Sequence, residues 1–233
     1  MSPRAYFADD SGELSLDGTW FFDYHRSDPN PNINPEVAFE QPFVPETETI
    51  DVPSHWVLRG DGRWGAPAYT NVDFPFPVDP PFPPEENPVG DYSRRFTCPE
   101  SWLTSGGQVR LRFDGVESQI IVWVNGQWIG MARGSRLAHE FDITQALVPG
   151  ENTVTLRVHQ FSAGSYLEDQ DQWWLPGVFR SVSLRYVPDF SIEDLWIDTD
   201  YEAGQGFATL ELRVRGAQSE TLEANLDVEG LGT

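Results

Sequence analysis

Ten residues at positions 165–174, SYLEDQDQWW, place three carboxylates beside two tryptophans. If this stretch is extended, Asp169 and Asp171 face the same side and stand roughly 6.6 Å apart, at ~3.3 Å per residue. Glycosidases use two carboxylates about 5–9.5 Å apart for acid/base chemistry. Such a pair must flank the sugar bond from opposite sides, whereas neighbours on one strand approach it from the same side. A catalytic pair is therefore the least favoured interpretation.

Two other interpretations of this stretch remain open. In the first, the carboxylates accept hydrogen bonds from sugar hydroxyls or from arginines, while aromatic rings such as Trp173 pack on apolar sugar faces. In the second, the stretch is a buried structural corner whose charges are paired by arginines such as Arg180. Both require polar partners, because burying unpaired carboxylates is prohibitively unfavourable.

The charge balance restricts the partners of the protein. The chain of 233 residues has 37 acidic residues, and all 15 basic residues are arginine, which gives a formal net charge of −22. This field repels phosphate backbones and anionic lipid, so we expect no binding to nucleic acid or membranes. A neutral partner such as a sugar fits better.

Cysteine content and hydropathy indicate the cellular compartment in which the protein works. Cys98 is the only cysteine, so no internal disulfide can form. The first residues have no apolar core typical of a signal peptide, and no apolar run approaches the roughly 20 residues that span a bilayer. These features predict a cytoplasmic protein.

Hydrophobic residues alternate with polar ones along most of the chain. Residues 109–113, 153–158 and 181–187 show the period of two that is typical of half-buried strands. In IIVWVNGQWIG, Asn125-Gly126 supplies the two positive-φ residues of a type I′ hairpin turn. Because no long helix is indicated, the sequence predicts an all-β sandwich or jelly roll.

Other motifs predict structure rather than chemistry. Residues 74–90 contain seven prolines and predict a stiff surface loop. GDGRWG at 60–65 matches a dinucleotide-binding pattern, but no helix follows it as that function requires. His139 and His159 lie in or beside predicted strands, so we expect them to be structural.

A second domain begins after the first. Strand-like segments restart after YVPDF, which gives domains at 1–187 and 188–233. An immunoglobulin-like sandwich needs about 100 residues. We therefore expect a jelly-roll β-sandwich followed by an incomplete immunoglobulin-like β-sandwich.

Several segments resemble the β-galactosidases of glycoside hydrolase family 2. The most specific is GSYLEDQDQWWLPGVFRSVSL at 164–184. The resemblance extends from about Leu14 to Pro188, and the other matching segments occur in the same order. These are LDGTW (16–20), VPSHW (52–56), AYTNVDFPFPVDPPFPPEENPVGDYSRRF (68–96), LRFDGVES (111–118), VWVNGQWIGMARGSRLAHEFDIT (122–144) and PGENTVTLRV (149–158).

The resemblance implies an architecture and a reaction. An N-terminal jelly roll and an immunoglobulin-like domain precede a catalytic TIM barrel in the family. The barrel carries both catalytic glutamates, so no catalytic residue is expected in this chain, which alone should be inactive. The implied reaction is retaining hydrolysis of terminal β-galactosides. Homo-oligomers and a requirement for magnesium and sodium are implied for the full-length enzyme only.

The resemblance also implies substrate contacts. The asparagine of YTNV contacts the sugar in the family, and it matches Asn71. An aspartate two residues before the serine of SYLEDQD contacts sugar and sodium, but this chain has Ala163 there, so the sodium contact is in doubt. Asp169, Asp171 and Trp173 are expected to support the pocket. No metal ligand is predicted within the chain itself.

Two alternatives stay open. One is another family 2 activity, a β-mannosidase or β-glucuronidase, against which SYLEDQDQWW argues. The other is a stand-alone carbohydrate-binding module, which nine tryptophans permit.

Overall fold

The computed structural model describes residues 12–28, 41–202 and 204–215, and these residues form two compact units within 1–187 and 188–233. Their strands are β1 (Glu13–Ser15), β2 (Gly18–His25), β3 (Thr49–Val52), β4 (Ala68–Thr70), β5 (Val89–Thr97), β6 (Gln108–Phe113), β7 (Val116–Glu117), β8 (Gln119–Val124), β9 (Gln127–Arg133), β10 (His139–Asp142), β11 (Glu151–His159), β12 (Gln172–Trp174), β13 (Gly177–Val178), β14 (Val182–Val187), β15 (Ser191–Glu202) and β16 (Gln205–Arg215).

Helical segments in the described residues are short. They are α1 (Glu100–Thr104) and the 3-10 turns η2 (Trp56–Leu58), η3 (Gly60–Gly62), η4 (Thr144–Ala146) and η5 (Ala163–Tyr166). None of the described helices has the length and apolar character that a membrane crossing requires.

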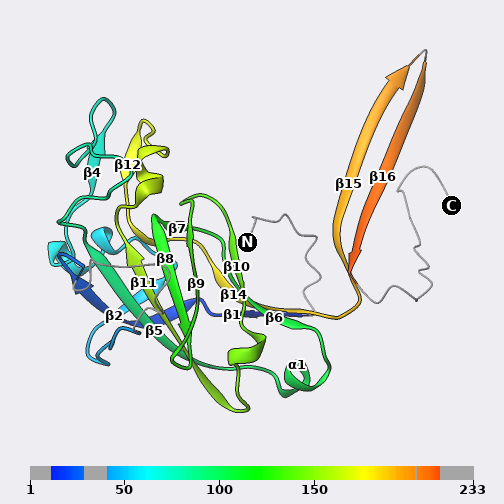
Figure 1. Ribbon diagram of the computed structural model, residues 1–233, viewed down its shortest axis with the longest axis horizontal. Coiled ribbons are helices and arrows are strands. Elements are labelled where there is room, and N and C mark those ends of the chain that lie inside the picture. The colour runs from blue at the N-terminus through cyan, green and yellow to red at the C-terminus, as the bar shows by residue number, and fades with distance from the viewer. Residues whose placement is uncertain (1–11, 29–40, 203, 216–233) are drawn as a thin grey trace. The chain divides into compact units, whose positions relative to one another are not determined.

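Two antiparallel sheets form the first unit (Figure 1). One has the strand order β1-β14-β6-β10, and the other has the order β3-β2-β5-β11-β8-β9. The inner faces of both sheets contribute to one hydrophobic core, which includes Trp20 and Leu156 from the larger sheet and Leu111 and Leu184 from the smaller one. This arrangement confirms the all-β sandwich predicted from the sequence.

The turn between β8 and β9 has the conformation that its sequence predicts. Asn125 and Gly126 have φ angles of 51° and 81°. Asn125 tolerates the left-handed region because its short side chain can bond locally. In this structure its side chain is held instead by distant residues, since Nδ2 donates to the Ala146 carbonyl and to Asn152 Oδ1, both at 2.8 Å.

The prediction of half-buried strands is wrong for β11. Val154, Leu156 and Val158 face the core, but Thr155, Arg157 and His159 on the opposite face are also buried. Residues outside the sheet cover that face: Asp28 bonds Arg157 and His159, and Gln41 Nε2 donates to Thr155 Oγ1 at 3.0 Å.

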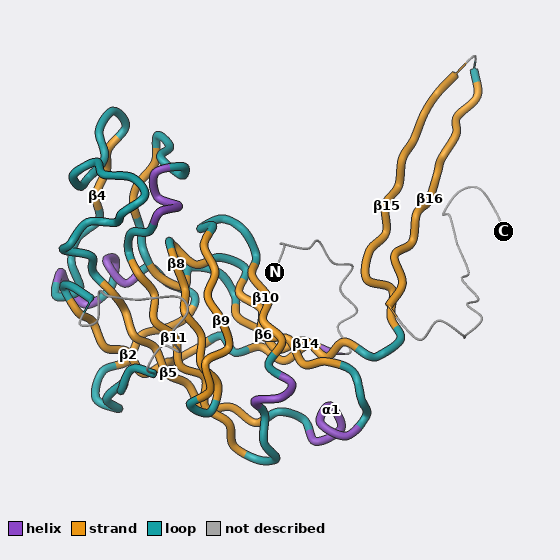
Figure 2. Tube along the Cα trace, viewed as in Figure 1, coloured by secondary structure: helices purple, strands orange, loops and turns teal. Residues whose placement is uncertain are grey.

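A small ladder in which β4 pairs with β12 extends the first unit at one end, and loops gather around it (Figure 2). Phe76 from the proline-rich loop packs there with Phe161 and Trp174 in a separate hydrophobic cluster. The loop between β4 and β5 has no regular secondary structure, as its prolines predict. A second short ladder joins β13 to β7.

The described part of residues 188–233 is a long antiparallel hairpin of β15 and β16. The predicted strands SIEDLWID and FATLELRV lie in β15 and β16. The third predicted strand, TLEANLDV, lies outside the described residues, so the immunoglobulin-like assignment stays a prediction.

Candidate functional site

The predicted site residues all come from segments at the β4–β12 end of the first unit. Asn71 directly follows β4 and is exposed, and its amide makes no hydrogen bond within the described chain. Thr70 before it is anchored, because Trp174 Nε1 donates to Thr70 Oγ1 at 2.8 Å. The fold therefore presents a free amide on a fixed strand end.

The adjacent tryptophans of SYLEDQDQWW point to opposite faces of β12. Trp174 is buried against Phe76 and Phe161, whereas Trp173 is 55% exposed. The Trp173 ring packs beside Tyr69 on β4, with ring centroids 5.5 Å apart. This short strand therefore places one tryptophan in a core and the other at the surface.

The carboxylates of this stretch do not bond Arg180. The Nη1 group of Arg180 donates to the backbone carbonyls of Asp114 and Arg136 instead. Asp171 accepts from the Tyr69 hydroxyl, so a tyrosine takes the place of the predicted arginine.

Asp169 and Asp171 do not lie on one extended segment either. Residues 167–171 are irregular, and β12 begins only at Gln172. Asp169 is half-buried, and its Oδ1 is buried without a hydrogen-bond partner among the described residues. Their role in supporting a pocket stays a prediction.

Ala163, at the start of η5, lines a cleft of about 400 Å³. The opposite wall is the proline-rich loop near Phe82, and Gln119, Arg133 and His159 also face the cleft. Asn71 is not among its lining residues. The structure therefore does not bring the two predicted substrate contacts into one cleft of this chain.

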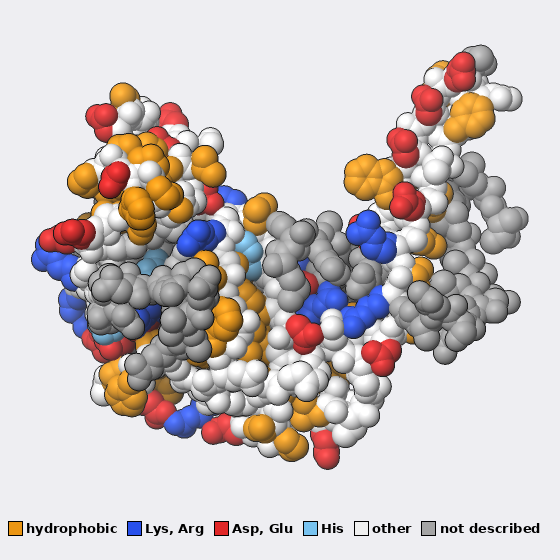
Figure 3. All heavy atoms as spheres, in the orientation of Figure 1, with side chains coloured by type: hydrophobic (Ala, Val, Ile, Leu, Met, Phe, Trp, Pro, Cys, Tyr) orange, Lys and Arg blue, Asp and Glu red, His pale blue; other side chains and the backbone are white. Residues whose placement is uncertain are grey.

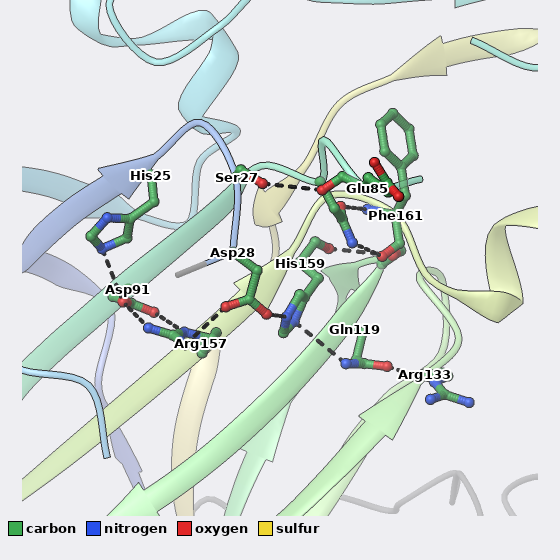
Figure 4. A network of polar contacts seen from close by, with 12 residues as sticks. His25, Ser27, Asp28, Glu85, Asp91, Gln119, Arg133, Arg157, His159 and Phe161 are labelled. Carbon is green, nitrogen blue, oxygen red and sulfur yellow. Dashed lines mark hydrogen bonds and ion pairs between the residues drawn. The ribbon is translucent and has the colours of Figure 1, made fainter. Parts of the chain in front are cut away.

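A buried polar network backs this cleft (Figure 4). Arg157 donates to both carboxylate oxygens of Asp91, at 2.8 and 2.7 Å, and its Nη1 reaches Asp28 at 3.2 Å. The other oxygen of Asp28 accepts from His159 Nε2 at 2.8 Å. Such pairing is required, because a buried charge without a partner is strongly destabilising.

The network continues toward the surface. The Gln119 amide nitrogen lies 3.4 Å from Nδ1 of His159 and can donate to it. The Gln119 carbonyl in turn accepts from Arg133 Nε at 2.6 Å. His139 is also bonded, through Nε2 to the Gly134 carbonyl at 3.0 Å. His139 and His159 are thus buried and partnered, as the sequence predicts.

Sequence reasoning missed Asp28, Asp91 and Arg157 as members of this network. The sequence did indicate that Arg157 and His159 lie on the same face of β11, because they are two residues apart in a strand. Nothing in the sequence showed that Asp28, far away in the chain, covers that side.

His25 at the end of β2 also contacts the network and gives the first prediction. Its Nε2 lies 3.2 Å from Asp91 Oδ2 and 3.5 Å from Asp23 Oδ2. The hydrogen bond to Asp91 raises the pKa of His25, while partial burial and Arg157 oppose the rise. The protonated form therefore stabilises the fold below the unfolded-state pKa of about 6.5, and this contribution is lost as pH rises through the higher folded pKa.

Urea unfolding of wild type and His25→Gln between about pH 5 and 8 tests this prediction. The stability advantage of wild type should be largest at low pH and shrink as the pH rises. A difference that stays constant or grows with pH would contradict the assignment.

The sodium contact implied by the resemblance does not fit Ala163. Its methyl side chain offers no oxygen ligand, and the described residues contain no group of three or more histidine, cysteine or acidic side chains that could hold a metal ion. No role for sodium is assigned to this position.

Comparison with known proteins identifies the family. Residues 14–188 match the model of the glycosyl hydrolases family 2, sugar binding domain. The chain belongs to glycosyl hydrolase family 2. The matched residues include both sheets and the two short ladders of the first unit, so the cleft beside Ala163 lies within the family 2 domain.

Curated relatives of this family 2 chain are named β-galactosidases. The protein from Arthrobacter sp. (strain B7) is 49% identical over 90% of this chain and 22% of its own length. The protein from Pectobacterium atrosepticum is 42% identical over 91% of this chain and 20% of its own length. The chain thus spans about a fifth of the curated relatives that it matches.

Solved structures share the fold at lower identity. A β-glucuronidase from an uncultured Clostridium species has a TM-score of 0.66 at 20% identity, covering 94% of this chain and 36% of that one. The β-glucuronidase of Bifidobacterium dentium has a TM-score of 0.63 at 21% identity, covering 93% and 38%. These likenesses show the fold alone.

Proposed function

We propose that this family 2 chain is part of a β-galactosidase, an enzyme that hydrolyses terminal β-galactosides with retention of configuration. The observation that carries the proposal is the 49% identity over 90% of the chain with a protein named β-galactosidase. The SYLEDQDQWW stretch and the AYTNV stretch, which carry the resemblance to this family, are joined where Gln172–Trp174 of β12 pairs with Ala68–Thr70 of β4.

In this proposal the β4–β12 end of the domain helps to form the galactose subsite. Exposed hydrophobic side chains gather over this end (Figure 3), including Val72 (83% exposed), Phe82 (65%) and Leu167 (87%). Such a patch is typical of a surface that contacts a partner or a ligand. Asn71 supplies the sugar-binding amide, and Asp169, Asp171 and Trp173 hold the surrounding loops.

Assays on a panel of nitrophenyl glycosides test the proposed activity. An enzyme that contains this sequence should hydrolyse the β-galactoside in preference to the β-mannoside and the β-glucuronide. The 233-residue chain alone should hydrolyse none of them above background. Preference for the glucuronide or the mannoside would replace the proposed substrate, and turnover by the chain alone would show that it contains catalytic residues.

Asn71→Ala gives the second prediction. An amide can both donate to and accept from sugar hydroxyls, and leaving these partners unmet costs about 1–3 kcal/mol. In the enzyme that contains this sequence, kcat/KM for the galactoside should fall roughly 5- to 150-fold. The control is Val148→Ala, 46% exposed in the turn before β11 and away from β4 and β12, which should change kcat/KM little. Equal kinetics for Asn71→Ala and wild type would remove Asn71 from the subsite.

A further inference from the structure

A second cleft, of about 310 Å³, lies between the 167–174 segment and the turn at 134–137. It shares no lining residue with the cleft beside Ala163. Its volume is at the lower end of the roughly 300–1,000 Å³ of ligand pockets, which suits one or two sugar rings.

Hydrogen bonds brace the two walls of this cleft against each other. Both carboxylate oxygens of Glu168 accept from Ser135, from the backbone N–H at 2.9 Å and from Oγ at 2.5 Å. Arg136 Nη1 donates to Glu117 Oε2 at 2.7 Å, and the Leu175 N–H donates to Glu117 Oε1 at 3.1 Å. The walls are therefore fixed, and the carboxylates that line them are already bonded.

One wall presents an aromatic face. Trp173 is 55% exposed and lines the cleft, and its ring rests against Tyr69. Tyr69 is fixed in turn, because its hydroxyl donates to Asp171. Exposed Leu167 and Leu137 extend the apolar rim. Burying such a surface against an apolar ligand face is favourable.

The free hydrogen-bonding groups beside this aromatic face include two amides. The side chains of Gln170 and Gln172 line the cleft, are exposed, and make no hydrogen bond among the described residues. Each side-chain amide has two N–H donors and a carbonyl oxygen that accepts. The cleft thus combines a fixed indole face with uncharged amides that can both donate and accept hydrogen bonds.

We propose that this cleft is a saccharide-binding site in which a neutral sugar stacks its apolar C–H face on Trp173 and bonds the Gln170 and Gln172 amides through its hydroxyls. An anionic ligand is disfavoured because two carboxylates, Glu117 and Glu168, line the cleft against one guanidinium, that of Arg136, and because the chain has a net charge of −22. The inference rests on the proposed function only in taking a sugar as the ligand class.

Titration of the 233-residue chain tests the site. The probes are methyl β-galactoside, lactose and cellobiose, followed by the indole N–H signals in NMR spectra. The Trp173 signal should shift saturably, with a dissociation constant on the order of 1–10 mM for at least one probe. Trp173→Ala should weaken binding at least about tenfold, and Gln172→Ala about threefold or more, whereas Trp173→Phe keeps a stacking face and should bind within about threefold of wild type.

Trp196→Ala is the matched control, because this tryptophan is 66% exposed on β15 and lies outside the cleft. If Trp173→Ala does not fold, Gln172→Ala and Trp173→Phe carry the comparison. Absence of saccharide binding overturns the proposal, and so does binding that Trp173→Ala and Gln172→Ala leave unchanged. Turnover of nitrophenyl galactoside by the longer enzyme is measured separately, so failure of this site and failure of the proposed function are distinguishable.

Discussion

Asp91→Ala is expected to lower the free energy of unfolding by about 3–5 kcal/mol, as is typical when one partner of a buried ion pair is removed. Asp91 is completely buried and accepts two hydrogen bonds from Arg157. Without it, the bond that the buried guanidinium keeps among the described residues is the one to Asp28, at 3.2 Å. Urea unfolding monitored by tryptophan fluorescence measures the loss.

The control for this prediction is an exposed ion pair of the same chain. Glu48 pairs with Arg63 at the surface, where both side chains are largely exposed. Because exposed ion pairs contribute about 0–1 kcal/mol, Glu48→Ala should have a small effect. Equal losses for Asp91→Ala and Glu48→Ala would show that burial of the network does not determine its contribution.

Gly177→Ala should be the other large effect, with a loss of roughly 2–5 kcal/mol from backbone strain and steric overlap together. Gly177 has a φ of +135°, and a Cβ there would lie 2.6 Å from the Ser54 carbonyl oxygen. Backbone hydrogen bonds on both sides of Gly177 hold the two segments at this distance. Ser54 N–H donates to the Val178 carbonyl and Trp56 N–H to the Pro176 carbonyl.

Gly62→Ala separates the cost of the strained backbone from the cost of steric overlap. Gly62 also has a positive φ, of +83°, but a Cβ there would meet nothing within 4 Å. Its substitution should therefore cost only about 1–2 kcal/mol, from the left-handed conformation itself. If thermal or urea unfolding gives both variants the same stability, the close approach at Gly177 is relieved by movement of the backbone.

The strands of the sandwich were predictable because their signals are local. The period of two over residues 109–113 and 181–187 corresponds to β6 and β14, and Asn125-Gly126 forms the predicted hairpin turn. In each case the residues that carry the signal are neighbours in the chain.

The partners of the charged residues were not predictable in the same way. The sequence suggested Arg180 for the carboxylates of SYLEDQDQWW, but Glu168 bonds Ser135 and Asp171 bonds Tyr69. Tyr69 is far from Asp171 in the chain and reaches it only because β4 pairs with β12. Which side chains meet therefore depends on strand pairing.

The sequence by itself determined the all-β class, the hairpin turn and, through long segments of resemblance, the family to which the chain belongs. Only the tertiary structure decided that the polar face of β11 is buried and that Arg157 lies between Asp91 and Asp28. It also decided that Asn71 and Ala163 do not line one cleft of this chain. The physical reason is that backbone alternation and turn geometry depend on adjacent residues, whereas burial and charge pairing depend on segments that meet only after folding.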